Sequence, residues 1–268
     1  MVRSAAAALV VLVSAGGASA QAPGYAAGQL ACARFVERAD ADIQGEAGGR
    51  TLTEKGGRYG RWIVRGVPAG DSGVRIEAWF DSLTIWRRSG DAVRSADTDG
   101  IIGGRYRGVL STAGSYTASA TPFVPDQVAE FADLHDAFTD LLPPLPPALL
   151  QAGAVWRDGS GTTIERLGDS VGADGPIQRY RLERQSARRD VSLDGSDTLR
   201  IPVKQTTVET GEFAWETARG LVSRTRTITV ETEVPAGGAV RVPVRSRVVQ
   251  RVTLVRVPDD ASACRESR

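Results

Sequence analysis

A long antiparallel hairpin is predicted by the C-terminal third of the chain, which reads RTRTITVE at residues 224–231, PAGG at 235–238 and VRVPVRSRVVQRVTLVRV at 240–257. The Pro and Gly residues of the middle segment are typical of a turn, and the flanking segments alternate on a period of two. β-Branched residues suit a pleated, half-buried surface. We therefore expect the valines to face the interior and the alternating arginines and threonines to face water.

Further strands are predicted by the same alternation at 74–80, 83–86, 180–184 and 201–204. A weak internal echo accompanies them, in which Trp is followed by Gly and then by Arg: Trp86/Gly90/Arg94, Trp156/Gly161/Arg166 and Trp215/Gly220/Arg224. We interpret each as a hairpin with a buried Trp, a tight turn in which Gly adopts positive φ, and Arg on the exposed face of the return strand.

One segment departs from the β pattern. Apolar residues recur there at steps of three and four, with acidic residues between them: Val128, Phe131, Leu134, His135, Phe138, Leu141 and Leu142. This spacing predicts one amphipathic helix at about 126–142, with Pro125 in its first turn and Pro143-Pro144 at its end. Residues 145–150 follow as a stiff, extended connector.

These elements predict a mainly β fold, an antiparallel meander that forms an open barrel or a sandwich. It has two halves of similar size, about 28–124 and 150–258, joined by the helix and the Pro-rich connector at 125–149. No long Gly/Ser linker separates the halves, so we expect residues 21–268 to form a single β-rich domain.

The N-terminus has the pattern of a secretory signal peptide. Arg3 precedes the apolar stretch 5–13, and Ala18-Ser19-Ala20 precedes Gln21, so residues 1–20 are expected to be removed. We therefore expect an exported protein, periplasmic or extracellular. Beyond the N-terminus no stretch approaches the roughly 18 apolar residues of a membrane-spanning helix, so no transmembrane segment is predicted.

The two cysteines, Cys32 and Cys264, lie near opposite ends of the mature chain. Pairing is the default expectation in an oxidising compartment, and the alternative is two free thiols. Neither cysteine lies in a Cys-x-x-Cys motif, and with a single His the available zinc ligands are scattered.

The charge balance argues against a nucleic-acid partner. The chain has 33 Lys+Arg, 32 Asp+Glu and a formal net charge of +1, with acids and bases interspersed along its length. A nucleic-acid-binding protein would gather an excess of basic residues into a patch.

Two serine motifs resemble those of hydrolases but fail on chain order. Gly168-Asp169-Ser170-Val171-Gly172 fits the nucleophile elbow, yet the single His135 precedes it, whereas Gly70-Asp71-Ser72-Gly73 has its His on the wrong side for a chymotrypsin-like protease. Asp97-Thr98-Asp99-Gly100 resembles only the start of a calcium loop. We predict no catalytic residue, no cofactor and no metal site, and we interpret His135 as a half-buried helix residue.

The helix ending in a Leu-Pro-Pro run, followed by Gly153-Ala154-Val155-Trp156 and a second set of strands, resembles an uncharacterised group of exported bacterial β-rich proteins. Their form is similar to that of the open-barrel lipoprotein carriers of the cell envelope. The resemblance spans residues 75–257, and it assigns no site residue because the group has no established catalytic residues.

Three functions are compatible with these features. The first is a non-catalytic carrier of an apolar or lipid-like ligand, the second is an envelope structural or interaction protein without a small-molecule ligand, and a distant third is a serine hydrolase. In a carrier, the ligand-facing part of the helix would be Phe131, Leu134, His135 and Phe138. The same stripe would otherwise be core, the alternative we favour because no Gly hinge lies between 126 and 142.

Overall fold

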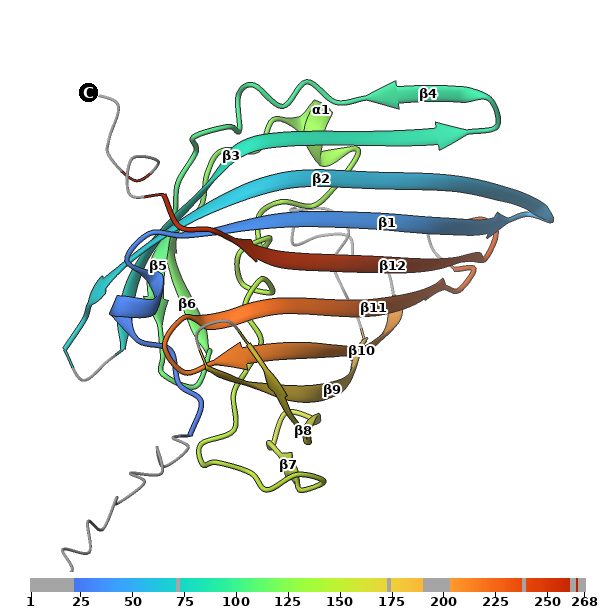
Figure 1. Ribbon diagram of the computed structural model, residues 1–268. Coiled ribbons are helices and arrows are strands. Elements are labelled where there is room, and N and C mark those ends of the chain that lie inside the picture. The colour runs from blue at the N-terminus through green and yellow to red at the C-terminus, as the bar shows by residue number, and fades with distance from the viewer. Residues whose placement is uncertain are drawn as a thin grey trace, which may run out of the picture.

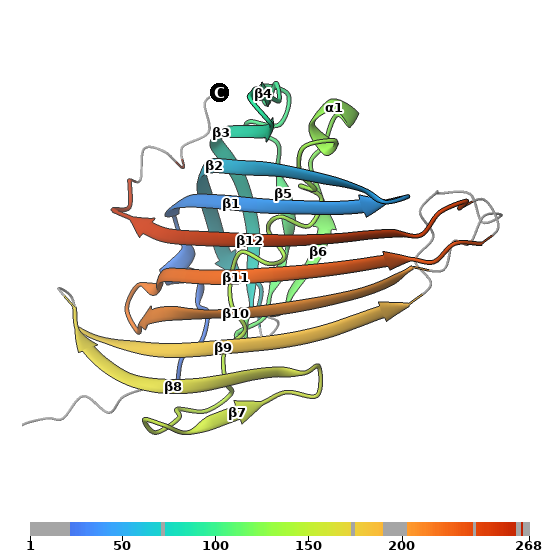
Figure 2. The ribbon, with the colours of Figure 1, turned by 90° about the vertical axis from the view of Figure 1, so that its right-hand side faces the viewer.

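A single curved antiparallel sheet of twelve strands forms the protein (Figures 1 and 2). The computed structural model describes residues 22–70, 73–172, 175–189, 203–237, 240–260 and 264. The strands are β1 (Ala33–Ala47), β2 (Arg50–Pro68), β3 (Val74–Ser89), β4 (Ala92–Ser95), β5 (Tyr106–Leu110), β6 (Tyr116–Ala120), β7 (Val155–Arg157), β8 (Thr162–Val171), β9 (Pro176–Arg189), β10 (Lys204–Glu216), β11 (Gly220–Val234) and β12 (Val244–Val257). Helical structure in these ranges is limited to a 3-10 turn, η1 (Ala27–Leu30), and one α-helical turn, α1 (Asp126–Ala129). The predicted mainly β, antiparallel, open architecture is confirmed. The signal-peptide residues 1–20 lie outside the described residues.

The sheet joins the two halves of the chain at its centre. Its order is β6-β5-β3-β2-β1-β12-β11-β10-β9-β8-β7, with β4 paired to β3. Each half is therefore a meander, and the halves meet where β1 pairs with β12 from Arg34↔Val257 to Ala47↔Val244. The predicted C-terminal hairpin is confirmed as β11 and β12. Strand β12 begins directly after Pro243, which cannot donate a hydrogen bond to the ladder.

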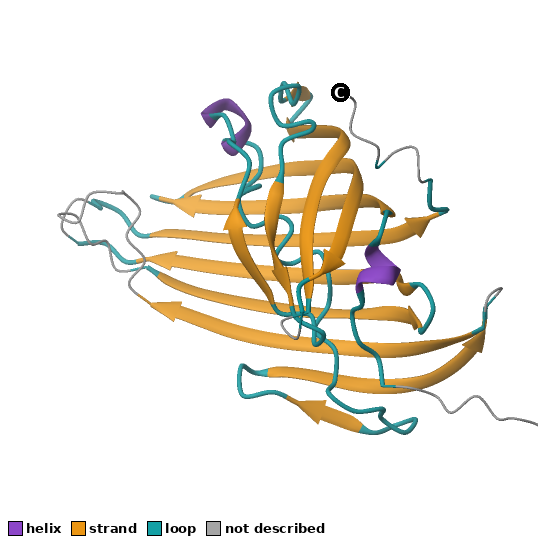
Figure 3. Cartoon of the chain, turned by 90° about the vertical axis from the view of Figure 1, so that its left-hand side faces the viewer, coloured by secondary structure: helices purple, strands orange, loops and turns teal. Residues whose placement is uncertain are grey.

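The sheet has an inner and an outer face because it curls. Bulges occur between Arg61 and Trp62 and between Ala214 and Trp215, and such bulges increase local twist. Gly60 permits a close approach at the first bend, since a Cβ there would lie 2.9 Å from the Phe80 ring. Figure 3 shows residues 121–154, which we call the crossing segment, running across the inner face from β6 to β7.

Aromatic side chains fill the space between the inner face and the crossing segment. Trp62 and Phe80 pack with ring centroids 3.7 Å apart, and Phe138 of the crossing segment lies 6.0 Å from Trp62. All three are at most 1% exposed. Tyr106 also joins this cluster and donates a hydrogen bond from its hydroxyl to the Leu134 carbonyl, at 2.6 Å. The crossing segment is thus part of the hydrophobic core.

The predicted helix at 126–142 is wrong beyond its first turn. After α1, four-residue turns follow, closed by N–H to carbonyl bonds from Ala137 to Leu134, Thr139 to Asp136 and Leu141 to Phe138. Asp133 accepts a hydrogen bond from the His135 N–H, a local contact that competes with helix formation. In addition, side chains of the sheet bind the Leu134, Asp140 and Leu141 carbonyls. The apolar spacing predicted the burial of Val128, Leu134, Phe138, Leu141 and Leu142 correctly, but here it is not the period of a helix.

Each of the three Trp-Gly-Arg segments does form a hairpin. Gly90, Gly161 and Gly220 have φ of 57°, 88° and 80°, as predicted for tight turns. The expectation that Arg lies on the exposed face is wrong for two of the three, because Arg166 and Arg224 are buried. These two arginines belong to the inner face, where they meet buried acidic and carbonyl groups.

Candidate functional site

Charged side chains lie on the inner face among apolar ones. Along β11, Arg224, Arg226, Ile228 and Val230 alternate with Thr225, Thr227, Thr229 and Glu231, so the two arginines share a face with the isoleucine and valine. Strand β10 places Glu209 opposite Ile228 and places Phe213 opposite Arg224. The inner face therefore combines an apolar surface with fixed charges.

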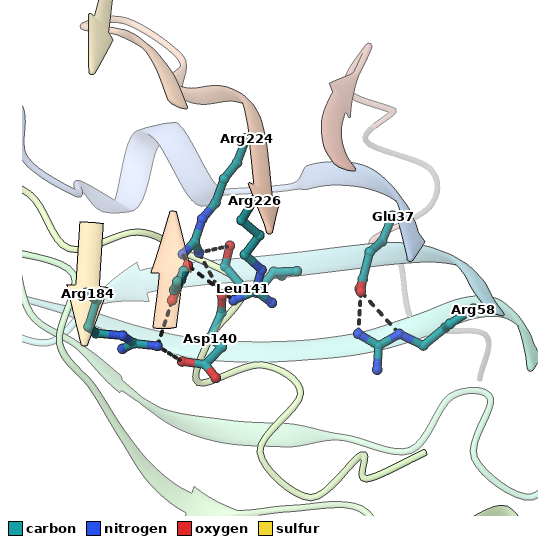
Figure 4. A network of polar contacts seen from close by, with 8 residues as sticks. Glu37, Arg58, Asp140, Leu141, Arg184, Arg224 and Arg226 are labelled. Atoms are coloured by element: carbon teal, nitrogen blue, oxygen red, sulfur yellow. Dashed lines mark hydrogen bonds and ion pairs between the residues drawn. The ribbon is translucent and has the colours of Figure 1, made fainter. Parts of the chain in front are cut away.

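Glu209 is the centre of this polar cluster. Figure 4 labels its arginine partners, Arg184, Arg224 and Arg226. The Glu209 side chain is 2% exposed and receives Arg224 Nη2 on Oε1 at 2.6 Å and Arg184 Nη2 on Oε2 at 2.8 Å. Arg226 Nη1 lies 3.7 Å from Oε1. Three strands, β9, β10 and β11, thus converge on one carboxylate.

The cluster also ties the crossing segment to the sheet. Arg184 pairs with Asp140 at 3.2 Å, and Arg224 Nη1 donates to the Asp140 and Leu141 carbonyls at 2.7 and 3.1 Å. Three arginines here meet two carboxylates, which leaves one excess positive charge. We call Arg184, Glu209, Arg224, Arg226 and Asp140 the Glu209 cluster.

Burial and neighbouring charges set the ionisation of these arginines. Burial, reinforced by repulsion from Arg226, lowers the pKa of Arg224 to about 10, although Glu209 attracts the proton. Burial also opposes the charge of Arg184, but attraction by Glu209 and Asp140 outweighs it and raises the pKa of Arg184. Both side chains therefore remain cationic at neutral pH.

A second buried carboxylate lies on β1, at the boundary of the aromatic core. Glu37 is 1% exposed, pairs with Arg58 of β2, and accepts a hydrogen bond from Trp62 Nε1 at 2.6 Å. Burial disfavours its charge, yet Arg58 and the hydrogen bonds from Trp62 and Arg58 outweigh this effect and lower the pKa of Glu37. Glu37 therefore stays ionised inside the protein.

An open cavity of about 340 Å³ adjoins the Glu209 cluster. Apolar side chains contribute part of its wall, and hydroxyl and charged groups contribute the rest. The lining includes Tyr116, Leu142, Leu145, Trp156, Leu182, Ser160, Thr162, Arg184, Glu209 and Arg224. It lies between the crossing segment and the strands β7 to β11, so its chemistry is amphipathic.

Beyond the cluster, the inner face continues toward the far ends of the central strands. Ile43, Val248 and Val230 lie in one row across β1, β12 and β11, and Ile228 lies in the next row opposite Glu209. All four are half-buried, and we call them the distal stripe. Figure 3 shows that these strands extend past the crossing segment.

The four residues predicted to face a ligand have different positions. Leu134 and Phe138 are fully buried in the core, which agrees with the core alternative. Phe131 is half-buried and contacts Arg94, with the guanidinium 5.6 Å from the ring centroid. His135 is exposed, so its interpretation as a half-buried residue is wrong, because its turn directs it away from the core.

The hydrolase and calcium motifs are accounted for by local structure where it is described. Ser170 lies within β8, paired with Ile177, and not in a strand-to-helix turn. Ser72 lies outside the described residues. Asp97 accepts a hydrogen bond from the Asp99 N–H at 3.1 Å, which forms a simple turn. Within the described ranges, no group of three or more His, Cys, Asp or Glu residues is placed to hold a metal ion.

The two cysteines meet where the sheet's central strands begin and end. Cys32 directly precedes β1 and Cys264 follows β12, and their Cα atoms are 5.9 Å apart, within the range of a disulfide. The β1–β12 pairing explains why residues 232 positions apart come together. No helix in the described part of the chain has the length and apolar character of a membrane span.

Sequence reasoning missed the Glu209 cluster because charged residues were assigned to solvent. The available signal was phase: Glu209 is in phase with Phe213 and Trp215, and Glu37 is in phase with Phe35. A charge in phase with buried aromatic residues predicts a paired charge on the buried face.

No protein-family model and no curated protein matches this sequence. Among solved structures, similar chains include lipovitellin, in a structure of its lipid–protein interactions, at 9% identity and a TM-score of 0.47, covering 88% of this chain and 26% of that one. Neisserial surface protein A matches at 13% identity and a TM-score of 0.25, covering 84% and 97%. A DUF1329 family protein from Desulfovibrio piger matches at 13% identity and a TM-score of 0.19, covering 86% and 91%. This chain thus spans about a quarter of the lipovitellin chain, and because all three TM-scores are below 0.5, the function proposed below is derived from its own residues.

Proposed function

We propose that the protein is an exported, non-catalytic binding module of the cell envelope that holds an amphipathic, lipid-like ligand on the inner face of its sheet. The observation that carries the proposal is that the distal stripe and the 340 Å³ cavity both adjoin the Glu209 cluster: Glu209 pairs with Ile228 of the stripe and also lines the cavity. An apolar tail would lie along the stripe, and a polar or anionic end would lie toward the arginines. Pockets that combine apolar walls with a few fixed polar groups are typical of small-molecule sites.

The proposal is tested with the mature protein from Gln21 and a dansyl-labelled fatty acid as probe. Val248 lies on the inner face and the adjacent Val249 on the outer face, and both are half-buried. Val248→Gln is expected to weaken probe binding about tenfold, a loss of about 1.4 kcal/mol. Val249→Gln, the matched control, should leave probe affinity unchanged.

The same measurements can also contradict the proposal. Absence of probe binding by the unmodified protein, or an equal loss in both variants at equal melting temperature, contradicts a lipid-like ligand on the inner face. Native mass spectrometry of the purified protein then identifies any ligand that co-purifies.

A second candidate function is that of an envelope interaction protein. The observation that favours it is separate from the inner face: strand β6 ends the sheet, and residues 117–120 are all exposed.

A further inference from the structure

Strand β6 is an exposed sheet edge. Tyr116–Ala120 contains no charged residue and no proline, two features that usually prevent an edge strand from pairing with another chain, and its bulge, opposite Arg107 and Gly108, lies after Ala118. In the described part of the chain, β6 pairs with β5 on one side only. Its backbone is therefore available for one more strand.

The ladder indicates which backbone groups point outward. The Ser111 N–H donates to the Ser115 carbonyl, and Val109 and Thr117 are the next hydrogen-bonded pair of the alternation. Tyr116 and Ala118, paired with Leu110 and Gly108, are then the non-hydrogen-bonded positions, so Ala118, which precedes the bulge, directs its N–H and carbonyl away from β5, toward the open edge. An added strand would bind there.

A basic pocket adjoins this edge on the outer face. It has a volume of about 440 Å³ and is lined by Arg65, Val67, Arg75, Ile76, Glu77, Arg107, Gly108, Val109 and Ser119. Among the described residues of this lining, three arginines accompany one carboxylate, that of Glu77, which Arg107 and Arg65 both contact. Arg107 is on β5, one strand from the edge, and its side chain is 59% exposed.

An apolar contact lies at the end of the same edge. Phe123, three residues after β6, is 80% exposed. An exposed aromatic ring that follows an open edge offers a partner an apolar contact in addition to backbone hydrogen bonds.

From these features we propose that an extended acidic segment of a partner protein adds to the sheet as a strand beside β6. Its backbone pairs with β6 at Ala118. Its carboxylates contact Arg107 and the other arginines of the basic pocket, and an apolar side chain packs on Phe123. Charge complementarity selects an acidic segment, because the described lining of the pocket has more arginines than carboxylates and Arg107 is largely exposed.

The test measures anisotropy of a labelled peptide with alternating Val and Glu, against the same peptide with Lys in place of Glu. Ala118→Pro removes the outward N–H without removing a β5–β6 bond, a change that edge strands tolerate. We expect Ala118→Pro and Arg107→Glu each to weaken binding of the acidic peptide by at least about fivefold. The controls are Val155→Pro, at the first residue of the opposite edge strand β7, and Arg179→Glu, a comparably exposed paired arginine of β9. Neither control should change the affinity.

Each of the following outcomes would overturn the proposal. No binding of the acidic peptide up to about 1 mM, or equal binding of the Lys peptide, excludes an acidic strand. Loss of dimers in Ala118→Pro by analytical ultracentrifugation, without peptide binding, assigns the edge to a second copy of this chain. Binding to phosphatidylglycerol vesicles that depends on Arg107 but not on Ala118 assigns the pocket to a lipid surface.

Discussion

Two buried glutamates fix the charged side chains of the inner face. Glu209 holds three arginines from neighbouring strands, and Glu37 joins Arg58 to the Trp62 indole. Because the charges are removed from water, their pairing is required for the folded state to tolerate them. Removing one member leaves its partners buried and unpaired.

Glu209→Gln is expected to lower the free energy of unfolding by about 3 to 5 kcal/mol, because Arg224 and Arg226 lose their buried countercharge. Urea denaturation measures the change. Glu212→Gln is the matched control on the same strand, since Glu212 is paired with Arg179 but its side chain is 42% exposed. Its change should stay within about 0.5 kcal/mol. Similar losses in both variants would contradict the assigned role of Glu209.

Glu37 predicts a pH dependence of stability. Its pKa in the folded protein is below its ordinary value of 4.5, so its contribution is complete above that value and is lost as the pH falls through the lowered pKa. In Glu37→Gln, the free energy of unfolding should therefore decline less steeply below about pH 5 than in the unmodified protein. Urea midpoints measured across this range test the difference, with the exposed Glu183→Gln as control. Parallel profiles for Glu37→Gln and the unmodified protein would contradict it.

At the scale of the element, the crossing segment acts as core without being a helix. Its carbonyls are bound by Tyr106 and Arg224 from the sheet, in place of helical N–H groups. The apolar side chains are therefore positioned by tertiary contacts. The difference in exposure between apolar residues of the segment distinguishes this arrangement from the predicted helix, in which all of them would be buried alike.

Phe138→Ala should cost about 3 to 5 kcal/mol of stability, because Phe138 is 1% exposed and packs on Trp62 and Tyr116. The half-buried Phe131→Ala should cost about 1 kcal/mol. Chemical denaturation of both variants, with the exposed Phe123→Ala as a control for loss of an aromatic ring, gives the order. Equal losses of stability in Phe131→Ala and Phe138→Ala would contradict this order and favour the predicted helix with a uniformly buried stripe.

Secondary-structure elements could be predicted where several sequence signals agreed. The 224–231 and 240–257 segments combine β-branched residues, alternation and a turn, and they do form β11 and β12. The helix prediction failed because spacing alone does not report competing hydrogen bonds, such as those to the Asp133 carboxylate and the Leu134 carbonyl. The Glu209 cluster depends on the register of β9, β10 and β11, which the sequence does not state.

At the scale of the whole molecule, the central β1–β12 pairing determines which distant residues meet. Fourteen residue pairs connect these strands, and the two cysteines lie beside them. The inner face is consequently built from both halves, since Glu37 comes from the first and Glu209 from the second.

The cysteine pair is tested by thiol labelling of the unfolded, unreduced protein. We expect no label before reduction and two labels after it, because Cys32 and Cys264 are positioned to bond. Replacing both by Ser should then lower the free energy of unfolding, by up to about 5 kcal/mol in the chain-entropy model. Two labels without reduction would show free thiols.

The central position of β12 also bears on how the protein is made. Strand β12 is the last of the described strands in the sequence, yet it lies between β1 and β11 in the sheet. Until β12 has been synthesised, a growing chain therefore has two unfilled strand edges, those of β1 and β11, in the middle of its future sheet. Such edges bind other chains readily, so a truncated protein that ends before residue 244 should aggregate. The two halves of the sheet join only when β12 pairs with both β1 and β11.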